Sequence, residues 1–390
     1  MKTWTRAIAA VVFLIAGNPA GANISPPEDE GPVQEQQAPS EARTAITEAS
    51  QLVQKWASKA DTSGAMHDMS AYRRQIEALH KIQATNTDAS TGIALTYYIA
   101  ELEWVVTADS GFGNGTPDRT LGQDALKNFD SVIAYGHDMP EWNIVLSSAN
   151  YLAGSTAAAM DGMSSSLALR YWTVCAAQGH PGCINNVAFE LGKPLTASDD
   201  DIRHILDLHA KVVATGTYAM CAGQFSAVSE AKLIHFTGVG RPGDDDIGLL
   251  DKAQTFYGQL KDKLHTADPC GGGRIGIDQY MMRLDRNERR PELLEDVEQH
   301  ESSALWLRVA SYLKGTTDEA GLAKAIAASQ GFETCELHFY AAWKARQEGK
   351  KDAAQAHYDA MLKIDPGHCS PERMEMRRYL KASAPDKPRR

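Results

Sequence analysis

The sequence lacks an excess of positive charge, long apolar runs and the alternating pattern of β-strands, and each absence excludes a class of protein. Its 39 Lys and Arg against 50 Asp and Glu give a net charge of −11 at pH 7. This balance argues against nucleic acid or an anionic membrane surface as the main partner, because both need a basic footprint. The apolar run at residues 7–16 is too short to span a bilayer. No segment alternates convincingly between apolar and polar residues, so we expect no β-sheet.

Complete catalytic and metal-binding motifs are also missing. Residues 300–304 begin like the helical zinc motif but have Ala where the second His must stand. Ser-x-x-Lys occurs at 229–232 and 311–314, without the Ser-Asp-Asn and Lys-Thr-Gly companions of the serine β-lactamases. The acidic triplets 199–201 and 244–246 precede helical patterns, where carboxylates cap free amide groups. We therefore expect no catalytic residue, no metal site and no cofactor.

The two ends of the chain differ in composition from its centre. Residues 1–22 have a positive start, an apolar run and an Ala-Gly-Ala end, which predicts a signal peptide. No cysteine follows the apolar run, so a lipid anchor is not indicated. Residues 23–40 are rich in Pro, Glu and Gln and predict a disordered leader, and residues 383–390 predict a disordered basic tail. We expect a bacterial periplasmic or secreted protein with no membrane insertion after signal cleavage.

Residues 41–382 show one window of helical periodicity after another, with short connections. The expected helices are 41–60, 68–84, 90–108, 119–134, 140–153, 165–178, 182–191, 199–214, 217–236, 246–266, 275–287, 291–314, 317–329, 334–348, 352–364 and 371–382. This length exceeds one ordinary core, yet no linker divides it. A stack of helical hairpins explains both observations, because each hairpin packs only on its neighbours and the core grows along the stack. The predicted fold is all-α, an irregular right-handed α-solenoid of antiparallel helical hairpins.

The clearest hairpin lies at residues 165–192, where Gly179 stands at the expected turn. Ala176, Gly179 and His180 match the Ala-Ala-x-x-Gly-His signature of the Sel1-like repeat, with Cys175 in the first Ala place. The segment therefore resembles a Sel1-like repeat, and its Cys-x7-Cys spacing is similar to the cysteine-rich secreted subgroup of that family. The resemblance implies a disulfide between the two helices and a binding role.

A second unit, residues 335–366, resembles a degenerate tetratricopeptide repeat. Gly349 stands at its turn, Ala354 and Tyr358 on its second helix, and Asp365-Pro366 at its end. Both resemblances imply that the helical surface holds a partner.

Six cysteines in an exported chain suggest three disulfides, although sequence alone permits many pairings. Cys175 and Cys183 each lie about one helical turn from the bend at Gly179. In each of two later hairpins the two antiparallel helices have similar lengths. The cysteine after the second helix would therefore lie close to the cysteine at the start of the first. The expected pairs are Cys175–Cys183, Cys221–Cys270 and Cys335–Cys369. The competing interpretation, a metal held by Cys175, Cys183 and His180, fits the ligand spacing of zinc sites poorly.

Tyr97, Glu101 and Trp104 fall on one stripe of a predicted helix. A buried stripe is the default interpretation, but these residues are the partner-binding anchors to test if the helix lines a groove. The leading hypothesis is a non-enzymatic scaffold, adaptor or immunity-type binder for a protein or peptide, and the acidic balance suits a basic partner. The alternative is a cell-envelope hydrolase, directed at peptidoglycan or a β-lactam, with dispersed catalytic residues.

Overall fold

The computed structural model describes residues 40–59, 68–114, 116–161, 165–215, 222–241, 243–264, 273–301, 303–369 and 371–382. Within these ranges all regular secondary structure is helical, and there is no strand. It divides into two compact units, Met1–Ile184 and Asn185–Arg390. The predicted signal peptide, leader and basic tail, together with Cys221 and Cys270, lie outside the described residues.

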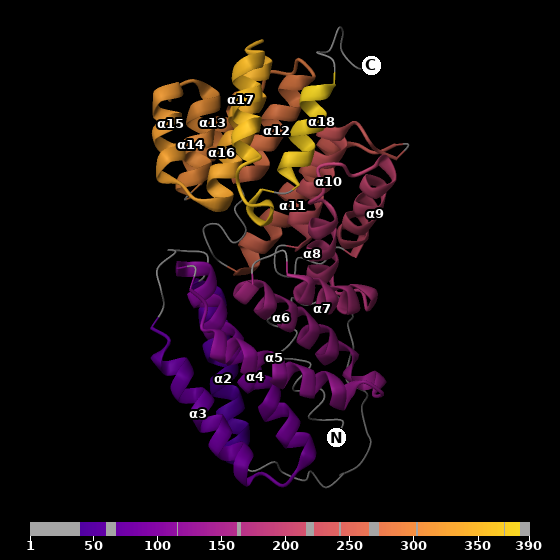
Figure 1. Ribbon diagram of the computed structural model, residues 1–390, viewed down its shortest axis with the longest axis vertical. Coiled ribbons are helices and arrows are strands. Elements are labelled where there is room, and N and C mark those ends of the chain that lie inside the picture. Colours follow the sequence, from indigo (N-terminus) through magenta and orange to yellow (C-terminus); the bar gives the residue numbers. More distant parts are fainter. Residues whose placement is uncertain are drawn as a thin grey trace. The chain divides into compact units, whose positions relative to one another are not determined.

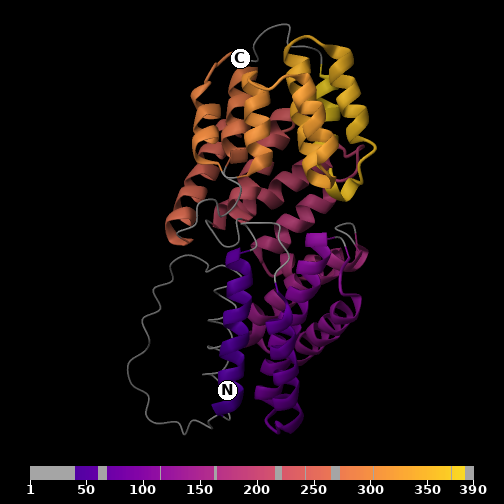
Figure 2. The same cartoon turned by 90° about the vertical axis from the view of Figure 1, so that its left-hand side faces the viewer.

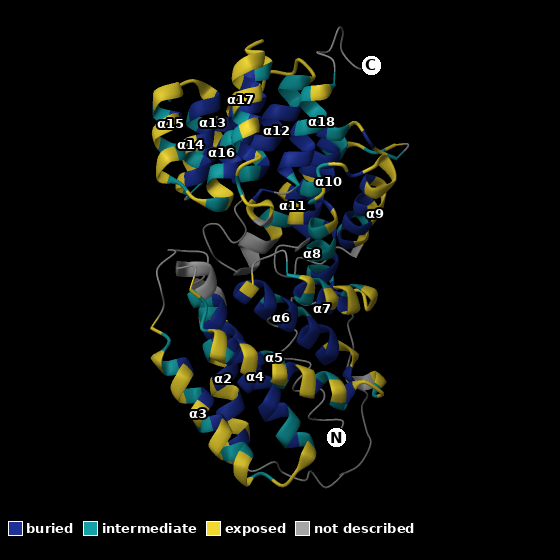
Figure 3. Cartoon of the chain, in the orientation of Figure 1, coloured by how far each residue is buried: buried dark blue, intermediate teal, exposed yellow. Residues whose placement is uncertain are grey.

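The first unit is built around one long helix that is buried on nearly all sides. Its helices are α2 (Ser40–Lys59), α3 (Ser70–Thr85), α4 (Ala89–Asn114), α5 (Arg119–Gly136), the 3₁₀ turn η1 (Pro140–Trp142), α6 (Asn143–Asp161), α7 (Ser166–Ala177) and the start of α8 (Pro181–Leu191). α4 packs against α2, α3, α5 and α6. It is apolar around its whole circumference, and such a helix is stable only inside a core. Figure 3 shows α4 and α6 mostly in the colour of buried residues.

The second unit is a longer run of helices in which most neighbours along the chain pack together. It contains the rest of α8, α9 (Asp199–Thr215), α10 (Ala222–Thr237), α11 (Asp246–Leu264), α12 (Gly273–Asp285), α13 (Glu292–His300), α14 (Ala304–Lys314), α15 (Glu319–Ala328), α16 (Gly331–Gln347), α17 (Lys351–Met361), η3 (Pro366–His368) and α18 (Glu372–Lys381). Figures 1 and 2 both show α13 to α17 side by side. The last helix departs from this order, because α18 packs on α10 as well as on α16 and α17.

One predicted helix is wrong. The sequence predicted a single helix over 291–314, but the chain is extended at Glu301 (ψ 138°) and at Ser303 (ψ 121°), which divides it into α13 and α14. The Glu301 carboxylate accepts hydrogen bonds from the backbone N–H groups of Ser303, at 2.6 Å, and Gly273, at 2.7 Å. Glu301 therefore caps the start of α12 by accepting the hydrogen bond from Gly273. Helical periodicity does not reveal this tertiary contact.

In two hairpins the first helix ends at a glycine, as the sequence predicted. Gly179 follows α7 with φ 85°, and Gly349 follows α16 with φ 74°. Only glycine adopts this left-handed conformation without steric cost. At each turn a backbone N–H just beyond the glycine bonds back to a carbonyl of the last helical turn, from His180 to Cys175 and from Lys350 to Ala345.

Two disulfides close hairpins, and both are pairs that the sequence predicted. Cys175–Cys183 joins α7 to α8 over 8 residues, and Cys335–Cys369 joins α16 to the segment after α17 over 34 residues. All four cysteines are fully buried. Disulfides of this kind are compatible with a secreted protein. None of the helices in the described ranges combines the length and apolar character that crossing a membrane requires.

We expect loss of the Cys335–Cys369 bond to destabilise the second unit by about 4 kcal/mol, and loss of Cys175–Cys183 to destabilise the first by about 2.5 kcal/mol. The difference follows from loop length on the chain-entropy account, because a longer closed loop restricts the unfolded chain more. Urea unfolding of Cys335→Ala/Cys369→Ala and Cys175→Ala/Cys183→Ala measures both. Equal losses, or none, would contradict the expectation.

Candidate functional site

The three residues predicted as partner-binding anchors lie inside the first unit. Tyr97 and Glu101 are 1% exposed and Trp104 is 7% exposed. Trp104 packs edge-on against Trp56 at 5.1 Å between ring centroids. The structure thus corresponds to the buried-stripe interpretation, and a partner could reach these side chains only if α4 separated from its neighbours.

Glu101 is a buried carboxyl group whose two oxygens have no hydrogen-bond partner among the described residues. Burial raises its pKa to about 8. Glu103, two residues later and on a different face of α4, accepts a hydrogen bond from Asn128 at 2.9 Å, and burial raises its pKa to about 8 as well. Both groups are thus protonated at mildly acidic pH and must lose a proton inside the core as the pH rises.

The first Ser-x-x-Lys pair does not form a nucleophile and base. Lys232 is 1% exposed, and its Nζ lies 3.3 Å from an oxygen of Glu372 and 3.5 Å from one of Glu375. Burial works to lower the pKa of Lys232, but these carboxylates outweigh it and raise the pKa above its usual value. A lysine held as a cation cannot take a proton from Ser229.

The second pair is arranged in a similar way on α14. Lys314 Nζ lies 2.8 Å from an oxygen of Glu298, and Ser311 donates to the other oxygen of the same carboxylate at 3.3 Å. The hydrogen bond from Lys314 to Glu298 raises the pKa of this lysine. Lys314 is therefore also a cation, and Glu298 separates its charge from the serine hydroxyl.

Lys232 belongs to a group of ionisable side chains enclosed in the second unit, which we call the buried charge cluster. Its members are Lys232 of α10, Arg274 and Asp278 of α12, Glu336 of α16, and Glu372 and Glu375 of α18. The side chain of Arg274 is 17% exposed and the others are 5% exposed or less. The cluster ties four helices together, and only Arg274 is in partial contact with solvent.

Arg274 is the centre of the buried charge cluster. Its guanidinium lies 2.9 Å from Glu372, 3.1 Å from Glu336 and 3.7 Å from Asp278. Two cations face four carboxyl groups, so not all of these can be charged together. Burial raises the pKa of Glu375 to about 8 and that of Glu336 to about 7. Burial also opposes the charge of Glu372, but Lys232 and Arg274 overcome it and hold the pKa of Glu372 below its usual value.

A second polar network lies beside the cluster and centres on His235 of α10. Its Nδ1 lies 2.9 Å from Asp246 and its Nε2 lies 2.7 Å from Asp285. Asp285 also accepts hydrogen bonds from Trp343 and Tyr379. Burial works against the charged ring, but the two carboxylates overcome it and raise the pKa of His235. Both ring nitrogens are occupied, so this histidine joins helices.

The remaining motif residues are placed in structural roles. Cys175 and Cys183 are bonded to each other, and buried His180 stacks on Tyr151 at 4.9 Å. In the first acidic triplet Asp201 forms a reciprocal capping box with Ser198. Within the ranges described, no three His, Cys, Asp or Glu side chains converge in a way that would hold a metal ion.

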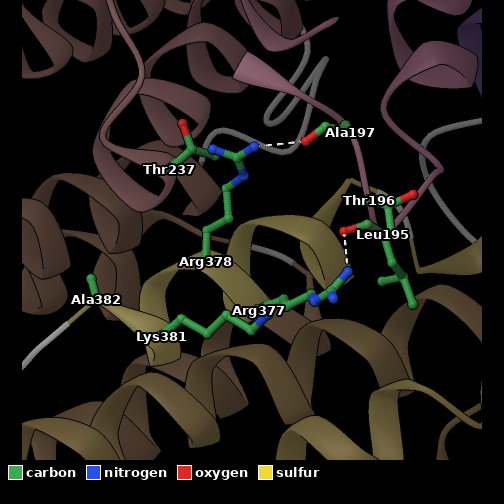
Figure 4. A pocket seen from close by; sticks show the side chains of 8 residues that line it. All are labelled: Leu195, Thr196, Ala197, Thr237, Arg377, Arg378, Lys381 and Ala382. Carbon is green, nitrogen blue, oxygen red and sulfur yellow. Dashed lines mark hydrogen bonds between the residues drawn. The ribbon is translucent and has the colours of Figure 1, made fainter.

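The second unit contains an open pocket of about 510 Å³ beside α18. Its lining residues are Leu195, Thr196, Ala197, Thr237, Arg377, Arg378, Lys381 and Ala382. Figure 4 shows Arg377 and Arg378 extending from α18 toward the 195–197 segment. Arg377 donates to the carbonyl of Leu195 and Arg378 to that of Ala197, each at 2.6 Å. We call this site the basic pocket.

The basic pocket has more cationic side chains than its carboxylate neighbours neutralise. Asp199 lies 2.6 Å from Arg378, and this hydrogen bond lowers the pKa of Asp199. Lys381 has no hydrogen bond or ion pair with any described residue. Arg377 uses only one of its guanidinium nitrogens, on Leu195. Free donors of two side chains therefore remain for a ligand.

Sequence reasoning missed both the buried charge cluster and the basic pocket. A signal existed for each. Lys232 is a lone cation in the otherwise mostly apolar window 227–236, and Arg377, Arg378 and Lys381 share one face of the last predicted helix at spacings of three and four. The partners of these residues lie far away in the sequence and could not be identified from such local patterns.

Comparison with known proteins gives no relative for this chain. No protein-family model matches it, and neither a curated protein nor a solved structure shows significant similarity. The resemblance to Sel1-like and tetratricopeptide repeats therefore stays a prediction from the motifs.

Proposed function

We propose that this protein is an exported, non-enzymatic binding protein of the bacterial periplasm, a scaffold, adaptor or immunity-type binder that holds a protein or peptide partner. Its run of antiparallel hairpins would form an irregular α-solenoid of Sel1-like and tetratricopeptide-like units. Neighbour-on-neighbour packing of most helices and the two hairpin disulfides support this proposal. The contact between α18 and α10 would then close one part of the array.

The observation that supports a binding role best is the chemistry of the basic pocket. Its lining side chains are three cations, two threonines and three apolar residues. Cationic and hydroxyl groups donate hydrogen bonds and attract an anionic group. None of the lining side chains is a carboxylate, imidazole or thiol that could act as a base near neutral pH. Such a pocket is suited to holding a ligand.

The alternative, a cell-envelope hydrolase, has less support. It would need a serine activated by a neighbouring base, and both candidate lysines are held as cations by carboxylates. The perturbed carboxyl groups of the buried charge cluster have the pKa values of general acids, but they are enclosed and do not line the basic pocket.

We expect the mature protein to show no turnover of nitrocefin or peptidoglycan. In pull-downs from envelope extract, we expect it to capture the same partner in the wild-type, Ser229→Ala and Ser311→Ala forms. Reduction of the disulfides should abolish capture, because the binding surface depends on closed hairpins. Mass spectrometry identifies the partner, and reciprocal capture with the purified partner checks specificity. Turnover that either serine substitution abolishes would contradict the proposal.

A further inference from the structure

We propose that the basic pocket binds carboxylate groups of an acidic peptide segment. This inference rests on the binding role proposed above and names the chemistry of the ligand. Three cationic side chains gather within one turn at the end of α18, in a chain whose net charge is −11. The pocket is thus opposite in sign to the chain as a whole, and at this site the partner would be acidic, unlike the basic partner expected from overall charge.

The cationic side chains of the pocket differ in whether their N–H donors are already used within the protein or are available to a ligand. Arg378 is occupied by Asp199 and the carbonyl of Ala197, so it holds the 195–197 segment against α18. Arg377 is anchored by one bond to Leu195, which orients its guanidinium and leaves its other N–H groups available. Lys381 lies one helical turn after Arg377 on the same face, with its ammonium group unpaired within the described residues. A carboxylate between these two side chains would receive charge-assisted hydrogen bonds from both.

The surroundings favour a carboxylate over a phosphate group. Asp199, Asp200 and Asp201 occupy the first turn of α9, next to the pocket lining, and Asp199 contacts Arg378 directly. Their charges would repel a dianion more strongly than a singly charged carboxylate. Thr196, an exposed residue of the pocket lining, offers a hydroxyl group to a peptide backbone. A volume of about 510 Å³ accommodates a short peptide segment.

A purely structural explanation must also be tested. Basic residues in the last turn of a helix stabilise its negative end, and α18 has Arg378 and Lys381 there. If this were their only role, substitution of Lys381 would change stability slightly and binding not at all. Lys381→Ala is the sharper variant, because Arg377→Ala would also release Leu195.

The experiment is fluorescence anisotropy with the full mature chain, three labelled probes and one competition measurement. The probes are an amidated hexaglutamate peptide, an alanine-rich peptide with a free C-terminal carboxylate, and an amidated hexaglutamine peptide; in the competition, inorganic phosphate is added to the bound hexaglutamate peptide. We expect the glutamate peptide to bind, the glutamine peptide not to bind, and affinity to fall as salt rises. The second probe shows whether a terminal carboxylate suffices. We expect millimolar phosphate to compete weakly.

Lys381→Ala should weaken binding of the glutamate peptide about fivefold, the upper range for an exposed ion pair, and Lys381→Glu should weaken it further. Lys324→Ala, an exposed lysine of α15, is the matched control and should leave affinity unchanged. Thermal unfolding of each variant shows that the fold is intact. The proposal is overturned if the glutamate peptide does not bind, if Lys381→Glu binds it as wild type does, or if phosphate alone occupies the pocket. Capture of an envelope partner that is insensitive to Lys381→Glu would refute this site while leaving the broader binding function standing.

Discussion

Replacement of Lys232 by methionine is expected to destabilise the second unit by about 3–5 kcal/mol. Lys232 is one of two cations in the buried charge cluster, and its loss leaves Glu375 without its ion-pair partner and Glu372 with Arg274 alone. Methionine is close to lysine in volume, so the effect measures the missing charge more than a cavity. Urea unfolding gives the free-energy change. Hydrogen exchange should show the largest loss of protection in α10 and α18.

A second substitution distinguishes the charge effect from packing. Lys232→Met/Glu375→Gln removes one cation and one carboxyl group together, and we expect it to recover part of the lost stability because fewer charges remain uncompensated. Lys324→Met, at an exposed position of α15, should change stability by less than about 0.5 kcal/mol. A Lys232→Met variant as stable as wild type would show that the cluster does not hold these helices together.

The second large effect concerns the dependence of the first unit on pH. The pKa of Glu101 is raised to about 8 in the folded chain from 4.5, so the folded state keeps a proton that the unfolded state loses. Stability should therefore be greatest below about pH 4.5 as far as this group is concerned, fall between pH 4.5 and 8, and level off above. Glu101→Gln should remove the contribution of Glu101 to this fall and stabilise the first unit at pH 9 by about 3–5 kcal/mol.

Thermal unfolding between pH 5 and 9 measures this effect. Glu103 contributes in the same direction, so Glu101→Gln should remove part of the pH dependence and Glu101→Gln/Glu103→Gln most of it. Glu77→Gln, on the exposed face of α3, is the control and should follow wild type. A Glu101→Gln variant that keeps the wild-type slope would mean that this carboxyl group is ionised in the folded protein.

Helical periodicity and turn residues predicted most of the fold. The predicted helices 119–134 and 199–214 differ by only one or two residues from α5 and α9. Their capping residues, Asp118 and Ser198, directly precede the apolar stripe in the sequence, so local patterns are enough to locate these helices. The break between α13 and α14 was missed for the opposite reason. Glu301 leaves the helical conformation while it caps α12, 28 residues earlier in the chain.

The sites were harder to predict than the helices, for a physical reason. A charged residue in a sequence is assigned to the surface, because an isolated buried charge is costly. Lys232 and Glu375 are buried only because each meets a counter-charge that sequence distance conceals. The basic pocket likewise forms because Arg377 reaches Leu195, 182 residues earlier in the chain. A helical hairpin can be predicted from local sequence patterns, whereas these contacts depend on how separate hairpins pack against one another.

The return of α18 to α10 sets an order for maturation. Lys232 precedes its partner Glu372 by 140 residues, so a chain that emerges from its N-terminus has both cations of the cluster in place long before α18 arrives. Until then Lys232 and Arg274 must stay hydrated or meet only Asp278 and Glu336. The second unit can therefore reach its final packing only after α18 has been synthesised. The packing of this last helix against α10 completes the assembly of the unit.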